Sequence, residues 1–506
     1  MWRNISFALW IVITICTTGL AQSPVRHPVP SEAELTGATK LVADAYKKEY
    51  TAAKSSAQKQ ALARKLISDA EQTKDDVVAR YAVLQVARKI AVGIADIELA
   101  MQIVDSTTKH YKLEDGEARS QVLNEISSAV KSPADVEAFL RHVRRALYAS
   151  VKKNQFDQAQ RLAELSLNKA SHAQLTKEWN RRSKEVSDQA NEYEGVKHAL
   201  EKLATSASDP DANGTVGKYM CFLQSDWGNG LSMLALSNDK VLQPLAEHEL
   251  KQDLKPTAMA DAWNAAATGL PEVLQTGALR RVEYWYRKAL PTASGLEQRR
   301  LQQKIQELTP RTTFFHVNEW EELLDFVDPA KHAFNTQIRR EGNSIVIQDH
   351  RDQGYFTVPV TATGSYELRV RALWVNERDE GIGIRLPGNN GACYFFNAYS
   401  GTVSGIGQVG GKDVNVNTSK IPGIPQPQGV PYEVHIRMER KGDDRVIIAS
   451  LNGRKYSRFQ TPVADLESLS SLPWHHEQFG ISDWWKVLHV QSIELKVLDG
   501  TASLTE

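Results

Sequence analysis

This chain has few cysteines, no charge imbalance and, after its first residues, no long hydrophobic run. Its 61 lysines and arginines equal its 61 aspartates and glutamates, so the formal net charge is +0 at pH 7. A dedicated nucleic-acid-binding protein would usually be more basic, and we therefore expect no nucleic-acid partner. No later segment is apolar over the roughly 20 residues that span a bilayer, which predicts no membrane span.

The three cysteines are Cys16, Cys221 and Cys393. Cys221 lies in a helical pattern and Cys393 in an aromatic strand pattern, so both are typical of small buried hydrophobic residues. The residues alone also leave open a disulfide between them, or a catalytic thiol with a histidine partner.

Complete catalytic and metal-binding motifs are missing as well. We find no Gly-x-Ser-x-Gly elbow, P-loop, HExxH or paired-cysteine motif. The acids Glu377, Asp379 and Glu380 are typical of a polar turn between strands rather than of a cleft. Adjacent His475 and His476 would point to opposite faces of a strand and rarely bind one ion. We therefore predict no metal site and no cofactor, and we favour a non-catalytic protein over an enzyme.

Residues 1–21 have the features of a cleaved signal peptide. Arg3 supplies a positive charge, residues 7–19 form a short apolar run, and Gly19 and Ala21 occupy the small-residue positions before a cut. The run is shorter than a bilayer span, which favours cleavage over anchoring. The protein is therefore expected to be exported, to the periplasm or the extracellular space.

After a short proline-containing linker at 22–30, residues 31–308 are predicted to form a helical region, with 205–214 as a candidate boundary inside it. Apolar residues recur every three or four positions. Four stretches share a helix, a tight polar turn and a second helix with a small residue where the two helices pack. Those small residues are Ala100, Ala159, Gly230 and Ala289.

This pattern resembles the stacked helical hairpins of tetratricopeptide (TPR) proteins, with spacing too uneven for a strict period of roughly 34 residues. We therefore expect a degenerate, TPR-like α-helical array, whose surface could bind a protein partner. The run at 217–222, Asp226-Trp227 and the Tyr-Trp-Tyr segment at 284–286 also resemble a helical module of secreted planctomycete proteins. This second resemblance covers residues 31–308 and implies architecture rather than chemistry.

Near Thr309-Pro310 the composition changes, and residues 313–506 are predicted to form an antiparallel β-sandwich. Alternation with a period of two replaces the helical periodicity, most clearly at 366–372. An aromatic strand is predicted at 392–399, and Asn452-Gly453 marks a hairpin turn. About ten such strands suit a two-sheet jelly roll. The predicted fold class is therefore a multidomain α plus all-β protein.

The strand order resembles the concanavalin-A-like or laminin-G-like jelly roll, including the domain named for 3-keto-disaccharide hydrolases. Gly-Ser-Tyr-Glu-Leu-Arg-Val at 364–370, Gly-Ile-Gly-Ile-Arg-Leu-Pro at 381–387 and the closing strand at 493–500 carry this resemblance. Glycosidases of this fold usually place paired carboxylates on one strand. That motif is missing here, so the resemblance implies a fold rather than an activity.

Aromatic residues are frequent in the sandwich region and point to a ligand. Sugars present C–H faces that stack on flat rings, while amides, carboxylates and guanidinium groups bind their hydroxyls. Most of these rings are expected in the core, but four are selected as candidate ligand-binding residues: Trp374, Tyr399, Trp474 and Trp484. The proline-containing loop at 418–431 would border such a site.

Together these features predict an exported, non-catalytic binding protein whose sandwich engages a glycan or a cell-envelope ligand. The helical array would act as a scaffold or as a surface for a protein partner. Two alternatives stay open: a glycoside hydrolase or related carbohydrate-active enzyme working in the sandwich cleft, and a structural envelope component.

Overall fold

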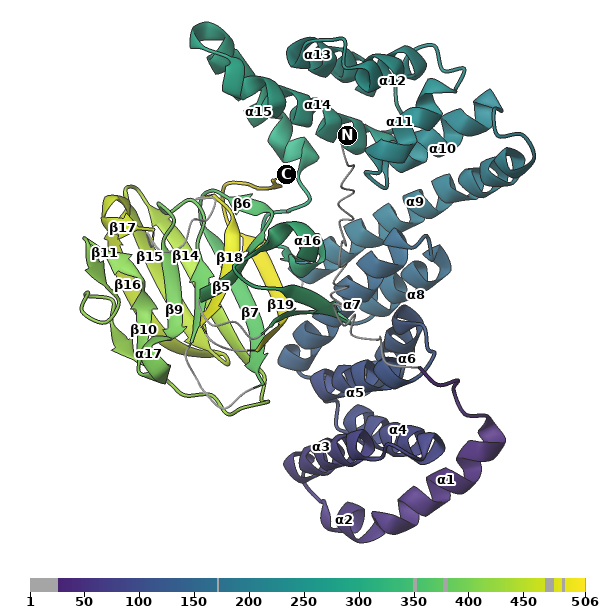
Figure 1. Ribbon diagram of the computed structural model, residues 1–506, viewed down its shortest axis with the longest axis vertical. Coiled ribbons are helices and arrows are strands. Elements are labelled where there is room, and N and C mark those ends of the chain that lie inside the picture. The colour runs from purple at the N-terminus through teal and green to yellow at the C-terminus, as the bar shows by residue number, and fades with distance from the viewer. Residues whose placement is uncertain are drawn as a thin grey trace, which may run out of the picture. The chain divides into compact units, whose positions relative to one another are not determined.

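The computed structural model describes residues 26–170, 173–348, 353–375, 381–468, 477–484 and 487–505 (Figure 1). The predicted signal peptide lies outside these ranges. The chain divides into two compact units, Met1–Val130 and Lys131–Glu506.

The first unit is helical. Its elements are α1 (Glu32–Ala45), α2 (Lys47–Ala52), α3 (Ser56–Gln72), α4 (Val77–Gly93), α5 (Ile97–His110) and α6 (Asp115–Ser127). Polar side chains begin several of these helices: Ser31 and Ser55 form capping boxes, and Asp76 and Asp96 accept hydrogen bonds from the first turn. Consecutive helices pack against each other, so their apolar faces form one shared core.

The second unit begins with helices and ends with a β-sandwich. Its long helices are α7 (Pro133–Lys152), α8 (Phe156–Leu167), α9 (Ala173–Thr205), α10 (Pro210–Phe222), α11 (Trp227–Ala235), α12 (Leu242–Lys251), α13 (Pro256–Ala267), α14 (Glu272–Ala289) and α15 (Gly295–Thr312). The helical region therefore runs a few residues past the predicted change at Thr309-Pro310, because Pro310 is accommodated inside α15.

The predicted hairpins are present in both units. Their turns repeat one conformation: Ala95, Asn154 and Ser225 each adopt a left-handed backbone with φ of 57°, 60° and 56°. This conformation reverses the chain between α4 and α5, α7 and α8, and α10 and α11. The small residues of the pattern, at 100, 159, 230 and 289, are all buried, as expected where two helices approach closely.

Two antiparallel sheets form the sandwich. In spatial order, the eight-stranded sheet contains β16 (Arg454–Pro462), β15 (Asp444–Leu451), β14 (Tyr432–Lys441), β7 (Tyr366–Trp374), β19 (Leu488–Val497), β4 (Ser344–Ile347) and β3 (Ile338–Glu341), with β1 (Trp320–Glu322) paired to β19. The seven-stranded sheet contains β13 (Ile421–Pro422), β10 (Val403–Ile406), β9 (Cys393–Asn397), β8 (Ile382–Arg385), β18 (Phe479–Trp484), β5 (Gln353–Val358) and β2 (Ala333–Phe334). This arrangement confirms the predicted fold class.

Shorter elements complete the sandwich. They are the strand pairings of β11 (Gln408–Val409) with β12 (Lys412–Asp413) and β17 (Leu466–Glu467), the pair β6 (Val360–Ala362) and β20 (Ala502–Leu504), and the single helical turns α16 (Pro329–His332) and α17 (Ala398–Gly401).

The core between the two sheets follows the predicted alternation. Tyr366, Leu368 and Val370 of β7 are at most 1% exposed and face the core. Asn452 and Gly453 both have positive φ, which closes the predicted hairpin between β15 and β16. The period-two alternation in the sequence therefore correctly predicted which of these residues fill the core.

Both described cysteines are buried and free. Cys221 belongs to the core of helices α10 to α15, and Cys393 to a small cluster on the seven-stranded sheet. Burial raises the pKa of each thiol, which disfavours a reactive thiolate.

Within the described part of the chain, no helix is both long enough and apolar enough to cross a bilayer.

Close backbone packing at Gly277 leaves no room for a side chain. A Cβ added to Gly277 in α14 would lie 1.9 Å from the carbonyl oxygen of Phe222, whereas one added to Gly195 in α9 meets nothing within 4 Å. We predict that Gly277→Ala lowers the free energy of unfolding by about 1–3 kcal/mol or more. Gly195→Ala, the matched control, should raise it by up to about 1 kcal/mol through helix propensity. Urea unfolding followed by circular dichroism checks both, and equal effects would contradict this packing.

Candidate functional site

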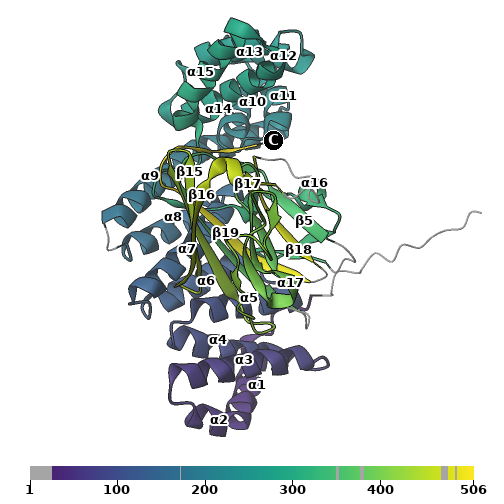
Figure 2. The same cartoon turned by 90° about the vertical axis from the view of Figure 1, so that its left-hand side faces the viewer.

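The outer face of the eight-stranded sheet carries charged residues that the alternating pattern places opposite the core. Glu367 on β7 and Glu494 on β19 are nevertheless only 7% and 2% exposed. Helices α7 to α9 lie beside this sheet (Figure 2), and their arginines contact its carboxylates. The part of this outer face at β1, β7 and β19 is thus an interior interface rather than a solvated surface.

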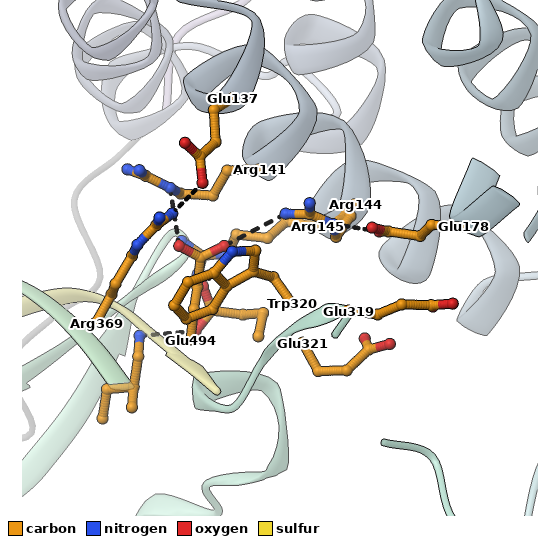
Figure 3. A network of polar contacts seen from close by, with 12 residues as sticks. Glu137, Arg141, Arg144, Arg145, Glu178, Glu319, Trp320, Glu321, Arg369 and Glu494 are labelled. Carbon is orange, nitrogen blue, oxygen red and sulfur yellow. Dashed lines mark hydrogen bonds and ion pairs between the residues drawn. The ribbon is translucent and has the colours of Figure 1, made fainter. Parts of the chain in front are cut away.

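Glu494 lies at the centre of the interface (Figure 3). Its Oε2 lies 3.0 Å from Arg141 Nε, and its Oε1 lies 3.4 Å from Arg144 Nη1. Arg144 Nε in turn donates to Glu178 Oε1 on α9 at 2.8 Å. Burial alone would raise the pKa of Glu178, but Arg144 and Arg182 outweigh it and hold this pKa below its usual value.

A second cluster surrounds Trp320 on β1. The Arg369 guanidinium carbon lies 3.9 Å from the centroid of the Trp320 ring, and Lys496 Nζ lies 4.9 Å from it. Arg369 also pairs with Glu137 of α7 at 2.6 Å. The buried charges of Arg141, Arg144, Arg369 and Glu494 thus each have an opposite partner, which offsets the cost of removing them from water. The part of this face at β1, β7 and β19 is consequently covered by the protein's own helices, whereas outer residues of β14 and β16 such as Arg437 and Arg458 stay exposed.

At one end of the seven-stranded sheet, β9 stops at Asn397 and the chain turns through α17. The prediction extended this strand to residue 399; it ends earlier because Asn397, Tyr399 and Ser400 all adopt left-handed backbone conformations. The Tyr399 ring is 52% exposed, and its hydroxyl donates to Asp413 Oδ1 at 2.9 Å. We call Tyr399, Asp413 and the adjoining loop at 418–431 the Tyr399 surface.

Buried amides hold this surface in shape. The Asn397 side chain donates from Nδ2 to the carbonyl of Ile424 at 2.6 Å and accepts from the Ile424 N–H at 2.7 Å. Gly423 packs so closely that an added Cβ would lie 2.1 Å from the Gly401 carbonyl oxygen. Asn417 donates to the Ile406 carbonyl at 2.8 Å. The loop is therefore preorganised rather than dependent on a ligand for its conformation.

Exposed side chains give the surface both polar and apolar character. Ile424 of the loop is 42% exposed, and Val416, whose N–H donates to the Asp413 carbonyl, is 67% exposed. A ring, aliphatic groups and a fixed carboxylate are suited to a ligand with apolar faces and hydroxyl groups.

The four predicted ligand-binding residues have different locations. Tyr399 is exposed, as a platform requires. The prediction for Trp374 is wrong, because its position on β7 faces the core. The residue is 1% exposed, and its ring centroid lies 4.6 Å from that of Tyr432 inside the sandwich. Trp474 and the side chain of Trp484 lie outside the described residues. Their roles stay predictions.

The acids and histidines that the sequence offers as catalytic or metal-binding candidates cannot be placed in the structure. Glu377, Asp379, Glu380, His475 and His476 all lie outside the described residues. Among the residues that the structure does describe, no group of three or more His, Cys, Asp or Glu side chains could hold a metal ion.

Asp413 of the Tyr399 surface and Asn397, which supports it, were both missed in the sequence. Asn397 was assigned to a strand and Asp413 to no site. The available signal was the turn composition Asn-Ala-Tyr-Ser-Gly at 397–401, since Asn and Gly tolerate left-handed conformations. Nothing local connects that turn to Asp413 or to Ile424, because these contacts depend on the path of the long loop.

Comparisons with known proteins concern the sandwich alone. A legume lectin-like domain from Entamoeba histolytica matches with a TM-score of 0.26 and 12% identity, covering 35% of this chain and 97% of that one. Peanut lectin matches with a TM-score of 0.26 and 10% identity, covering 37% of this chain and 98% of that one. The VIP36 exoplasmic/lumenal domain, solved with Ca2+ and Man3GlcNAc, matches with a TM-score of 0.25 and 11% identity. The match covers 36% of this chain and 97% of that one. Such distant likeness carries no information about a ligand.

No protein-family model matches the chain. No curated protein matches it either.

The interface around Glu494 can be tested by one isosteric change. We predict that Glu494→Gln lowers the free energy of unfolding by about 3 kcal/mol, because Arg141 and Arg144 lose a buried counter-charge. Urea denaturation checks this. Glu194→Gln is the matched control, since it breaks an exposed ion pair with Lys197 and should leave the midpoint unchanged. Equal midpoints for both variants would show that the interface does not depend on Glu494.

Acid should weaken the eight-stranded sheet through Glu367, which pairs with His435, Arg437 and Lys496 of the neighbouring strands. Burial raises its pKa, but His435 and Lys496 outweigh burial and lower the pKa to about 2. The unfolded chain therefore binds the proton more tightly, and stability from this group is present above about pH 4.5 and lost as pH falls toward 2.

We predict that Glu367→Gln removes on the order of 1–2 kcal/mol at pH 7, after solvent screening, and almost nothing at pH 2. Denaturant unfolding of both proteins across this pH range measures the difference. A gap between the two curves that stays constant with pH would contradict the assignment.

Proposed function

We propose that this chain is an exported, non-catalytic binding protein whose β-sandwich engages a glycan through the Tyr399 surface. The observation that carries the proposal is the exposed Tyr399 ring, oriented by Asp413 on a loop that buried amides hold in place. Flat rings bind the C–H faces of sugars, and a fixed carboxylate accepts hydrogen bonds from their hydroxyls.

The packing of the helices supports this choice of surface. Part of the other sheet, at β1, β7 and β19, is buried against α7 and α9. Strands β8, β9 and β10 are themselves buried, so the exposed loops that follow β9 and β10 are the part of the seven-stranded sheet left for a ligand. Preorganised loops reduce the entropy lost on binding, which suits a small and weakly binding ligand such as an oligosaccharide.

The helical array would then hold the sandwich on a rigid support. In this proposal the array also offers its remaining surface to a protein partner, and the leader at 1–21 directs export to the periplasm or outside. Trp474 and Trp484 remain candidate members of the glycan site.

A polysaccharide panel tests the proposal on the whole chain. We expect tryptophan fluorescence or calorimetry to detect binding of at least one glycan without release of reducing ends. Tyr399→Ala should weaken that binding by roughly tenfold, the loss expected for one stacked ring. Trp474→Ala and Trp484→Ala test the other two candidates.

Tyr50→Ala is the matched control, because Tyr50 is 54% exposed on α2 and belongs to no proposed site. Equal affinity of wild type and Tyr399→Ala would remove the Tyr399 surface from the proposal. Release of reducing ends would instead make the chain a carbohydrate-active enzyme. Silence across the panel would overturn glycan binding altogether.

A further inference from the structure

A separate cleft of about 460 Å³ lies between helices α7, α9 and α14 and the segment at 313–326. Its apolar wall contains Tyr148, Phe314 and Phe326, whose rings lie about 6 Å apart in neighbouring pairs. This volume falls in the range of small-molecule sites. None of its lining residues belongs to the Tyr399 surface.

Most cations lining the cleft already have a carboxylate partner. This holds for the arginines at 144, 145, 181 and 182 and for Lys184, which pair with acids on the same helices or on the strand at 320–322 and its flanks. Their charges stabilise the fold and are not available to a ligand.

Arg280 of α14 is the exception. Its Nε donates to the carbonyl of Thr312 at 2.8 Å, and its guanidinium carbon lies 3.3 Å from the centroid of the Phe314 ring. In the described ranges, no carboxylate forms an ion pair with it. Desolvation lowers the pKa of Arg280 to about 10, which Glu185 and Glu283 offset only in part. At neutral pH it is still a cation.

A partly buried cation without a counter-ion is costly, and a bound anion would relieve that cost. The guanidinium stays planar and charged, and its free Nη donors match the two oxygens of a carboxylate. Six acids also line the cleft, at 185, 188, 272, 321, 322 and 325. Five of these six acids pair with a cation, so the guanidinium of Arg280 is left to compensate one negative charge, which favours a monoanion over phosphate and other dianions.

We propose that this cleft binds a small organic monocarboxylate with an apolar or aromatic body, whose carboxylate pairs with Arg280. The body lies against the wall formed by Tyr148, Phe314 and Phe326. This site is independent of the glycan proposal, because the two share no residue and require different ligand chemistry.

The test uses the whole chain and 3-phenylpropionate as the probe, with binding measured by calorimetry or ligand-observed NMR. Wild type should bind the carboxylate, and its neutral analogue 3-phenylpropionamide should bind about 10- to 100-fold more weakly, as loss of a charge-assisted pair predicts. Arg280→Gln should lose affinity for the carboxylate by a similar factor and leave the weak amide binding unchanged.

Arg300→Gln is the control, since it removes an exposed arginine from the neighbouring helix α15. Circular dichroism establishes that each variant is folded, and Arg280→Lys, which keeps the charge but loses the fork, should bind with intermediate affinity. Absence of binding to wild type, equal affinity for the amide, or unchanged affinity in Arg280→Gln would each overturn the proposal. Displacement of the probe by equimolar inorganic phosphate would overturn the choice of a monocarboxylate.

Discussion

The buried ion pairs around Glu494 are the constraint on which the rest of the second unit depends. Arg141 and Arg144 on α7 reach this single carboxylate on β19, and Glu178 on α9 balances Arg144 from the other side. Charges removed from water are costly unless they are paired, so these ion pairs favour one arrangement of the elements that carry them. The helices of the second unit and the sandwich are consequently held together in part by buried charge pairs.

This arrangement determines which surfaces of the second unit are covered by its own elements. The charged residues of the eight-stranded sheet at β1, β7 and β19 make internal contacts with α7 and α9, so this part of the sheet is covered. The same packing of helices on the segment at 313–326 also creates the cleft around Arg280. The second unit thus carries two chemically different surfaces: a ring and carboxylate at Tyr399, and a cation without a carboxylate partner in an aromatic cleft.

Patterns along the chain predicted the elements well and the site poorly. Helical periodicity, small packing residues such as Ala159, and the Asn452-Gly453 turn each describe interactions between close neighbours, and the structure contains them. Trp374 was misjudged because an aromatic residue on a strand has the same local signature whether it faces the core or water. Arg280 gave no signal at all, since an arginine in a helix is ordinarily exposed and paired.

The sequence by itself determined the fold class, because the periods of 3.6 and 2 residues are set by backbone geometry and are visible in any window of the chain. Only the tertiary structure decided which charges are buried and which stay without a partner. Arg144 and Glu494 are 350 positions apart and meet only when the helices pack on the sandwich. Burial and charge compensation are properties of such distant contacts, so no local pattern records them.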